Sequence, residues 1–347
     1  MTHTRSAVLI SVLAAAALLV GCSRGGGTTG TPTPGATDTV AAATPTATPG
    51  PIGASNVANL KAGASFTVSQ PVRLVWSRSG ALWSVSARRV DAVDPTKGTV
   101  TKVFEVQEPE TIVDLHDAGI AAVANAQGAV RLVEITGNTA LQTFQAGGPV
   151  RGGNFFGDKV TLSRTDTIEA AIYSLGTGQK SGTLSGFQTA APVYAVTVSP
   201  DGKTAAWVAR GTLQFANVAS NVLGTKVQFE DFIGSYAFSP DSQLFATATG
   251  VAGSGGALTG RVQLWQPSSG TELQRVEQPG VIGSVAFGPQ HLLVTGGDNG
   301  ATVWNGDTGA KLGTVAGGKV RLAAFSFDGT TLATVADDGS GKVWRAQ

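Results

Sequence analysis

The chain has 347 residues and a formal net charge of +1, and it contains 47 glycines but only three tyrosines and one methionine. So much glycine predicts many tight turns and argues against a protein built from long helices. The balanced charge argues against nucleic acid as a partner, because a clustered basic face is the usual footprint of nucleic-acid binding. The single cysteine excludes an intramolecular disulfide.

Residues 1–21 are typical of a secretory signal peptide. Arg5 precedes an apolar run from Ala7 to Val20, which is shorter than the roughly 18 residues needed to span a bilayer. The sequence Leu-Val-Gly-Cys at 19–22 resembles the lipobox of bacterial lipoproteins. The resemblance implies that Cys22 carries lipid, begins the mature chain and holds it in the bacterial cell envelope, on the extracytoplasmic side of a membrane. The alternative is an ordinary signal peptide with a cysteine at this point by chance.

Residues 22–55 have a different composition, dominated by Thr, Pro, Gly and Ala. A stretch with so little apolar side chain to bury cannot offset the entropy lost on ordering. We therefore expect a lipidated cysteine followed by a disordered tether, joined to a folded domain at residues 56–347.

One pattern recurs through this domain, about every 40 residues: a bulky residue shortly before a turn. It is clearest at three tryptophans and continues toward the N-terminus with other residues: Trp344, Trp304, Trp265, Phe215, Tyr173, Val133 and Val93. In four units a glycine follows five positions later, at Gly98, Gly178, Gly270 and Gly309. This placement predicts a turn residue with positive φ, and Asn138 can replace glycine for the same reason.

A second motif runs in step with the first. It reads Val-Ser-Pro-Asp-Gly at 198–202, Phe-Ser-Pro-Asp-Ser at 238–242 and Phe-Ser-Phe-Asp-Gly at 325–329, and weaker versions bring the total to seven. Short β-prone runs between the motifs provide about four strands per unit. Seven units over residues 56–347 have about 42 residues each, as expected for propeller blades. The sequence thus predicts an all-β, seven-bladed β-propeller of four-stranded blades.

These motifs resemble those of the WD-repeat family of β-propellers over the whole repeated region. The resemblance implies a structural hydrogen-bond network in which a turn Asp, a strand Thr and a Trp take part. The matching residues are Asp298, Thr295 and Trp304 in one unit and Asp338, Thr334 and Trp344 in the next, while Trp265 marks a third unit. The sequence departs from the family in lacking its Gly-His dipeptide, and in having Gln266, Asn305 or Arg345 where the family has Asp after the Trp.

The two ends of the domain are expected to meet. The last unit has room for three strands only, and residues 57–68 lie ahead of the first complete unit. We expect this N-terminal segment to complete the last blade, which would close the ring and remove an exposed sheet edge.

The sequence offers little for catalysis or metal binding. His116 and His291 fall in turns of different units, so no zinc site with three or four converging ligands is expected. No nucleophile elbow opens a helix, and no catalytic residue, cofactor or metal is predicted. Carboxylate pairs in loops leave one alternative open, a propeller enzyme of quinoprotein-like or hydrolytic type with its site at the central channel mouth. These pairs are Asp337 with Asp338, Glu230 with Asp231, and Glu108 with Glu110.

A candidate partner-binding face follows from the repeat. The loops between second and third strands and the connections between units should share one side of the ring. That side receives five cations and two aromatic residues: Arg88, Arg151, Arg164, Arg210, Lys319, Phe187 and Phe232. Such groups could bind an acidic peptide or a protein surface, or they could form a solvated rim together with Glu108, Asp166, Asp231 and Asp298. A glycine-rich insertion at 248–260 lies on the same side and is either a mobile lip or a tolerated loop.

The sequence therefore favours a non-catalytic extracytoplasmic lipoprotein whose propeller acts as a protein-interaction scaffold or ligand-binding module. The expected partner is another envelope protein or a peptide, and the membrane is contacted through the lipid anchor only. Besides the enzyme, the alternative is a role like that of the propeller lipoprotein of outer-membrane protein assembly, which typically has eight blades.

Overall fold

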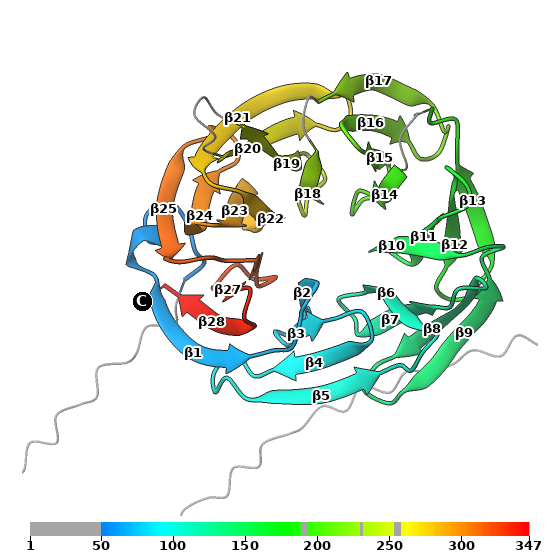
Figure 1. Ribbon diagram of the computed structural model, residues 1–347, viewed down its shortest axis with the longest axis horizontal. Coiled ribbons are helices and arrows are strands. Elements are labelled where there is room, and N and C mark those ends of the chain that lie inside the picture. Colours follow the sequence, from blue (N-terminus) through cyan, green and yellow to red (C-terminus); the bar gives the residue numbers. More distant parts are fainter. Residues whose placement is uncertain (1–49, 189–192, 230–231, 253–257, 347) are drawn as a thin grey trace, which may run out of the picture. The chain divides into compact units, whose positions relative to one another are not determined.

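The computed structural model describes residues 50–188, 193–229, 232–252 and 258–346, and these form a ring of seven four-stranded sheets around a central channel (Figure 1). All strands within each sheet are antiparallel neighbours in chain order, except in the last sheet, which also takes the first strand. The predicted seven-bladed β-propeller is confirmed. The predicted signal peptide, Cys22 and most of the tether lie outside the described residues.

The first three blades run from the innermost strand to the outermost in chain order. Their strands are β2 (Arg73–Trp76), β3 (Leu82–Val85), β4 (Arg89–Val93) and β5 (Val100–Glu105); β6 (Thr111–Leu115), β7 (Ile120–Ala124), β8 (Ala129–Glu134) and β9 (Thr139–Gln145); and β10 (Val150–Phe156), β11 (Lys159–Arg164), β12 (Ala170–Ser174) and β13 (Lys180–Leu184).

Blades four to six follow the same plan. Their strands are β14 (Val193–Val198), β15 (Thr204–Ala209), β16 (Thr212–Asn217) and β17 (Leu223–Gln228); β18 (Ile233–Phe238), β19 (Phe245–Ala252), β20 (Leu258–Gln266) and β21 (Thr271–Pro279); and β22 (Ile282–Phe287), β23 (Leu292–Gly297), β24 (Gly300–Asn305) and β25 (Lys311–Ala316). Blade seven consists of β26 (Leu322–Phe325), β27 (Thr331–Val335), β28 (Ser340–Arg345) and β1 (Lys61–Thr67). Two short 3₁₀ helices, η1 (Val57–Asn59) and η2 (Pro289–His291), complete the described elements.

The N-terminal strand completes the last blade, as predicted. β1 pairs antiparallel with β28, from Lys61 opposite Arg345 to Thr67 opposite Ser340. The folded domain extends further toward the N-terminus than the predicted boundary at residue 56. Ile52 is buried, and its N–H donates to the carbonyl of Gly329 in blade seven at 2.8 Å. Burial of the Ile52 side chain in the apolar cluster between blades six and seven stabilises this part of the expected tether in an ordered position.

The core lies between neighbouring blades. Second strands are the most completely buried, and every residue of β23 and β27 is buried, whereas outermost strands such as β9 alternate between exposed and half-buried positions. One cluster joins Leu244 and Val262 of blade five to Leu293 and Trp304 of blade six. The removal of each such buried side chain from water contributes roughly 1.5–3 kcal/mol to the free energy of folding. Because these side chains are buried between blades, the stability of every blade depends on its neighbours.

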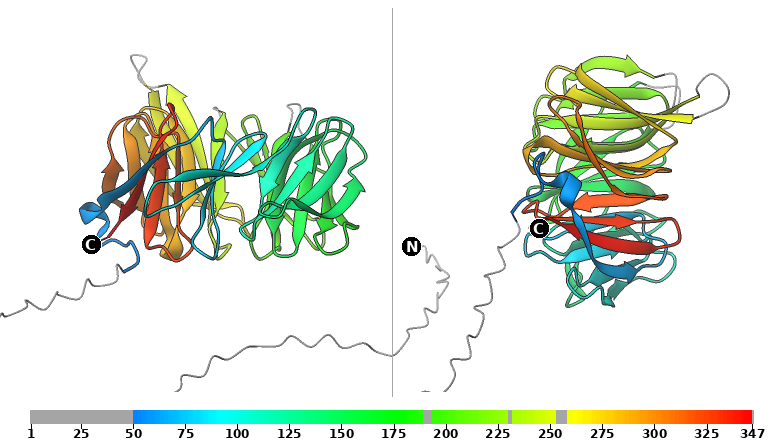
Figure 2. Two further views of the ribbon diagram at one scale, coloured as in Figure 1. Left: turned by 90° about the horizontal axis from the view of Figure 1, so that it is seen from below. Right: turned by 90° about the vertical axis from the view of Figure 1, so that its left-hand side faces the viewer.

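Two kinds of connection give the ring two different sides (Figure 2). We call the side with the turns between first and second strands the turn face, and the opposite side, with loops between second and third strands and connections between blades, the loop face. On the turn face, the four predicted turn glycines and Asn138 all have positive φ, which confirms the prediction. On the loop face, the insertion at 248–260 lengthens β19 and β20 into a hairpin that rises from the ring (Figure 2). The five residues at its tip, 253–257, lie outside the described residues.

Candidate functional site

The repeated tryptophans make structural hydrogen bonds inside the blades. The indole N–H donates to a buried threonine hydroxyl from Trp304 to Thr295 at 3.0 Å, and from Trp344 to Thr334 at 2.9 Å. Trp265 makes the same bond to Thr247 at 2.9 Å. In blade six one more hydrogen bond extends this contact, because the Thr295 hydroxyl donates to the side-chain oxygen of Gln278 at 2.9 Å. These residues belong to the scaffold of the ring.

Asp298 and Asp338, which the resemblance placed in the same network, make no hydrogen bond to these Trp–Thr pairs in the structure. Asp298 accepts from the backbone N–H of Val281 at 2.8 Å and is 3.7 Å from the ammonium group of Lys319. Asp338 accepts from the N–H and the hydroxyl of Ser340 at 2.9 Å and 2.6 Å. Asp298 thus links its loop to the connection before blade six, whereas Asp338 bonds within its own loop, and the network that the family resemblance implied is divided into two parts.

Blades three and four change this arrangement. In blade three Tyr173 replaces the tryptophan and Leu162 the threonine, while the neighbouring Thr161 faces the other side of the sheet, where among the described residues its buried hydroxyl has no hydrogen-bond partner. In blade four Trp207 lies at the position of the threonine, where it pairs with Gln214 and neighbours Phe215 across β16. The ring of Trp207 stacks on Phe187 with centroids 5.2 Å apart.

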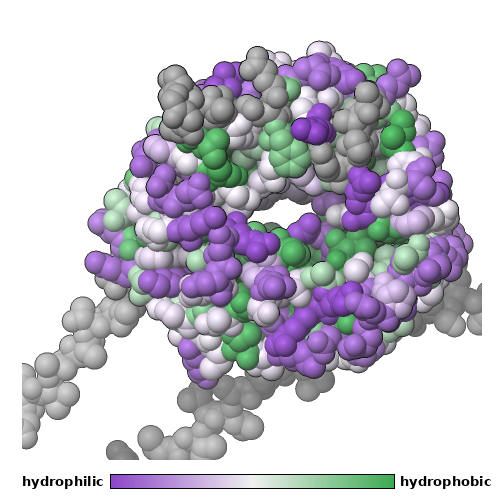
Figure 3. Space-filling model, in the orientation of Figure 1, coloured by the Kyte–Doolittle hydropathy of each residue, from purple (hydrophilic) through white to green (hydrophobic). Residues whose placement is uncertain are grey.

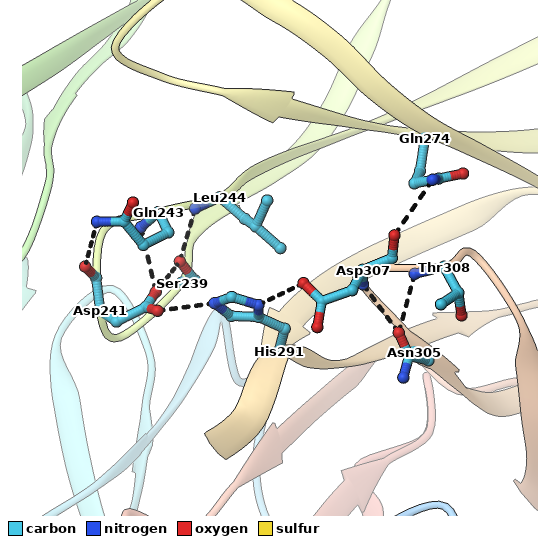
Figure 4. Close-up of polar contacts among 9 residues, drawn as sticks. All are labelled: Ser239, Asp241, Gln243, Leu244, Gln274, His291, Asn305, Asp307 and Thr308. Carbon is cyan, nitrogen blue, oxygen red and sulfur yellow. Dashed lines mark hydrogen bonds and ion pairs between the residues drawn. The ribbon is translucent and has the colours of Figure 1, made fainter.

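The turn face carries a histidine held between two carboxylates from different blades (Figure 4). His291, in the first turn of blade six, is 2.6 Å through Nδ1 from Asp307 and 2.7 Å through Nε2 from Asp241 of blade five. Burial alone would lower the pKa of His291, but the hydrogen bonds and negative charges of the two aspartates outweigh it and raise that pKa. Both ring nitrogens donate in the imidazolium form, so the cluster is an ionic link between blades five and six.

The aspartates of these turns already have structural roles. The hydroxyl of Ser239 donates to Asp241 at 2.7 Å and accepts from the N–H of Leu244 at 2.9 Å. The same arrangement recurs in the turns of Asp201 and Asp328. His116 lies in blade two against Asp117, so the two histidines contact different aspartates. Over residues 50–346, outside the three internal gaps, no group of three or more His, Cys, Asp or Glu residues is placed to hold a metal ion.

The predicted cations all lie at the loop face or at the loop-face end of an inner strand, and most have acidic partners. The guanidinium group of Arg88 is 2.6 Å from Glu108, and that of Arg164 makes two bonds to Asp166 at 2.8 Å and 2.6 Å. Lys319 is 2.8 Å from Asp337. Arg210 is exposed between β15 and β16, while Arg151 lies on the inner strand β10 and lines the channel. These cations and acids form a rim of neutralised pairs.

The two predicted aromatic anchors differ in their exposure to solvent. Phe232 lies on the loop face with 50% of its surface exposed. Phe187 was expected beside it, but it is fully buried, and this part of the prediction is wrong. The connection after β13 folds inward because the ring of Phe187 stacks on Trp207, where burial of two large aromatic rings outweighs exposure of either. Phe187 therefore cannot contact a partner.

An apolar patch on the loop face was not anticipated from the sequence. Leu258 at the start of β20 is 49% exposed, and Val281 in the connection to blade six is 41% exposed. The two lie close together, because the N–H of Gly280 donates to the carbonyl of Leu258 at 2.8 Å. We call these two residues, together with the exposed Phe232 on the same face of blade five, the blade-five patch. Figure 3 looks onto this face, where apolar side chains occur beside the central opening and near the blade-five hairpin.

The central channel is a hollow with a volume of about 1170 Å³. It is lined by inner strands of all seven blades and by their turns, and its opening is visible at the middle of the ring (Figure 3). On its wall Arg73 of β2 forms an ion pair with Asp114 of β6, and Asp114 also accepts from the N–H of Phe155 on β10 at 2.8 Å. Sequence analysis missed this pair, since its members lie in different blades and in no shared motif.

Comparison with known proteins agrees with this architecture. Residues 311–345 match the family model described as WD domain, G-beta repeat. A chain of the solved structure titled Crystal Structure of Mitotic Checkpoint Complex is similar in fold, with a TM-score of 0.66 and 19% identity, over 82% of this chain and 92% of that chain. No curated protein matches the chain. Within the part of the chain that the structure describes, no helix is long and apolar enough to cross a membrane.

Proposed function

We propose that this WD40-like β-propeller is a non-catalytic scaffold that binds another protein through its loop face, while lipid on Cys22 holds it on the extracytoplasmic side of a bacterial membrane. The partner is an envelope protein or a peptide segment of one. The scaffold role rests on the repeat match and the fold. The anchor rests on the signal sequence, which ends in the chain's one cysteine.

The observation that carries the binding proposal is the blade-five patch. Phe232, Leu258 and Val281 come from three separate loops, and each has two fifths or more of its surface exposed. Apolar side chains that gather on a surface between polar ones mark protein-interaction sites more often than scattered ones do. The ion pair of Arg261 with Glu277, on β20 and β21 of the same blade, supplies polar groups of the kind that border such a patch in protein interfaces.

The position of the N-terminal segment supports this choice of face. Ile52 bonds to Gly329 in the first turn of blade seven, which lies on the turn face. A tether that joins the ring there leaves the loop face on the opposite side. The blade-five patch would then remain accessible to a partner while the chain is anchored.

The anchor is tested by Cys22→Ala with fractionation of cells into membrane and soluble parts. We expect the wild-type protein in the membrane fraction, and the variant either in the soluble fraction or as unprocessed precursor. Membrane retention of a processed Cys22→Ala protein would contradict the lipid anchor.

The binding face is tested by chemical crosslinking and pull-down from native envelopes. The double change Phe232→Ser with Leu258→Ser should lose the captured partner and leave the melting temperature nearly unchanged, because exposed substitutions usually alter stability by no more than about 0.5 kcal/mol. Val222→Ser is the matched control, since Val222 is 64% exposed in a turn on the opposite face. Equal capture by both variants would contradict the proposed face.

A further inference from the structure

The first turn of blade six, residues 288–292, has a backbone unlike that of the other first turns, and we call it the blade-six turn. Gln290 and His291 are consecutive residues with positive φ, at 53° and 54°. Non-glycine residues rarely adopt this left-handed region, and they stay there only where the surrounding structure holds them. The structure describes all six other first turns, and each has a single residue with positive φ: Gly80, Gly119, Gly157, Gly202, Ser242 or Gly329. The blade-six turn is therefore strained and needs contacts that hold it.

Backbone hydrogen bonds close this turn but leave Gln290 without support. The N–H of Gly288 donates to the carbonyl of Leu292 at 2.7 Å, and the carbonyl of His291 accepts from the N–H of Gly306 at 2.8 Å. Gln290 is exposed, and its side chain makes no hydrogen bond to another described residue. The side chain of His291 is therefore the group that can hold the strained pair.

The imidazole ring of His291 is fastened at both nitrogens (Figure 4). Nδ1 is 2.6 Å from Asp307 in the turn between β24 and β25, and Nε2 is 2.7 Å from Asp241 in the first turn of blade five. Both aspartates are themselves fixed. Asp241 accepts from the hydroxyl of Ser239 at 2.7 Å, and the N–H of Asp307 donates to the side-chain oxygen of Asn305 at 2.9 Å. The ring thus joins the blade-six turn to two supported carboxylates.

Only the charged form of the ring can make both contacts. An imidazolium has an N–H on each nitrogen, whereas a neutral imidazole has one N–H and one lone pair. In the neutral form that lone pair would face a carboxylate oxygen, at 2.6 Å from Asp307 or at 2.7 Å from Asp241. The contact would be repulsive, so loss of the proton breaks one of the two contacts whichever tautomer forms.

Two negative charges act on the ring. Burial would lower the pKa of His291, but the hydrogen bonds and charges of Asp307 and Asp241 outweigh it and raise that pKa. Asp328, in the neighbouring first turn of blade seven, accepts from the hydroxyl of Ser326 at 2.6 Å instead. The ring therefore loses its proton at a higher pH than an exposed histidine, whose pKa is about 6.5.

The blade-six turn also contacts blade seven. Pro289 lies so close to Gly329 that a Cβ on residue 329 would overlap the proline ring. The carbonyl of Gly329 accepts from the N–H of Ile52 at 2.8 Å. A change of conformation at Pro289 would therefore alter the packing of blade seven beside the N-terminal segment.

We propose that the blade-six turn is a conformational switch that responds to pH. While His291 is an imidazolium, its contacts with two carboxylates hold residues 290–291 in the left-handed conformation. When the proton is lost, one contact breaks, the strained backbone relaxes and Pro289 moves away from Gly329. The switch does not depend on the proposed protein partner.

NMR spectroscopy of the isotope-labelled full chain carrying Cys22→Ala tests the switch between about pH 5 and about pH 10. The ring of His291 should titrate with a midpoint above about 6.5. The Cα and Cβ chemical shifts of Gln290, which depend on its backbone conformation, should leave their left-handed values with the same midpoint. Asn138, which has a φ of 50° in a turn without a histidine, is the internal control and should keep its shifts.

A pair of variants separates the switch from a general effect of pH. Asp307→Asn removes one contacting carboxylate and should lower the midpoints of the His291 ring and of the Gln290 shifts together. Asp158→Asn removes a carboxylate from the first turn of blade three and should leave both midpoints unchanged. Titration of the ring while Gln290 keeps its left-handed shifts, a ring midpoint at or below about 6.5, or separate movement of the two midpoints in Asp307→Asn would each overturn the proposal.

Discussion

At the scale of single residues, two buried threonines on second strands differ in whether their hydroxyl groups are hydrogen-bonded. Thr295 accepts from Trp304 and donates to Gln278, so its hydroxyl satisfies two other buried groups. Thr161 lies on the second strand of blade three but faces the other side of the sheet from Tyr173, and among the described residues its buried hydroxyl has no hydrogen-bond partner. A buried polar group is stabilising only when it is bonded, and the two positions therefore should respond oppositely to the loss of the hydroxyl.

We predict that Thr295→Val destabilises the ring by about 2–4 kcal/mol, because it leaves the Trp304 N–H and the Gln278 oxygen unsatisfied in a buried site. Thr161→Val should be neutral or slightly stabilising, since valine has the same shape and removes an unbonded hydroxyl. Urea unfolding followed by tryptophan fluorescence measures both. A comparable loss of stability in the two variants would show that the hydroxyl bonds in blade six are not what stabilises it.

Residues also show where reasoning from the sequence succeeds. The family resemblance implied that Trp304 with Thr295, and Trp344 with Thr334, belong to one network each, and the indole–hydroxyl bonds lie within those pairs. Turn glycines such as Gly309 were predictable because only a positive φ explains them. The position of Phe187 was not, because its burial depends on Trp207, which replaces a small residue in one blade only.

At the scale of elements, neighbouring blades are joined by side chains from their turns and inner strands. Asp114 of blade two bonds to the N–H of Phe155 in blade three, and Asn154 of blade three bonds to the N–H of Val198 in blade four at 2.7 Å. Such contacts connect residues about 40 positions apart and follow no short motif. The repeat therefore predicts the blades themselves, while the polar links between them become visible only when the ring is assembled.

The link at His291 should make the stability of blades five and six depend on pH. The pKa of His291 is raised in the folded protein, so its stabilising effect is fully present below the ordinary value of about 6.5 and is lost as the pH rises through the folded value. Because these groups are partly exposed and screened by solvent, we expect the ionic link to contribute about 1 kcal/mol to the free energy of unfolding. Asn is the suitable replacement because His291 has a positive φ of 54°.

The measurement is the melting temperature of the wild type and of His291→Asn at about pH 6 and about pH 9. At the lower pH the melting temperature of the wild type should be about 2 °C above that of the variant. This difference should become smaller at the higher pH. Asp307→Asn should reduce the effect by removing one of the two carboxylates. Parallel curves for wild type and His291→Asn at both pH values would mean that the ionic link does not contribute.

At the scale of the whole molecule, the two faces of the ring differ in how much their connections vary from blade to blade. Strand β1 pairs with β28, which removes the open edge of the last blade, and the N–H of Ile52 bonds to Gly329 at the turn face. The turn face repeats similar serine–aspartate turns from blade to blade, as at Ser199, Ser239 and Ser326. The loop face instead carries connections of different length and the raised β19–β20 hairpin, and variation between otherwise equal repeats is where a specific surface can arise.

The number of blades and the closure of the ring were predictable because period and strand pattern agree over seven units. The start of the domain was not, since Ile52 is one apolar residue within a stretch of Pro and Gly. Strand order was enough to place these loops on one side of the ring. The blade-five patch was not predictable, because Leu258 and Val281 are separated in sequence and come together only through the hairpin.

Photo-crosslinking in intact cells tests the proposed binding face most directly. A photoreactive amino acid placed at Leu258 on the loop face should yield a discrete crosslinked band with one envelope protein, and the same amino acid at Val222 on the turn face should yield none. Mass spectrometry of the band then identifies the partner. A discrete band from Val222 together with none from Leu258, in proteins that are folded and present in equal amounts, would contradict the account.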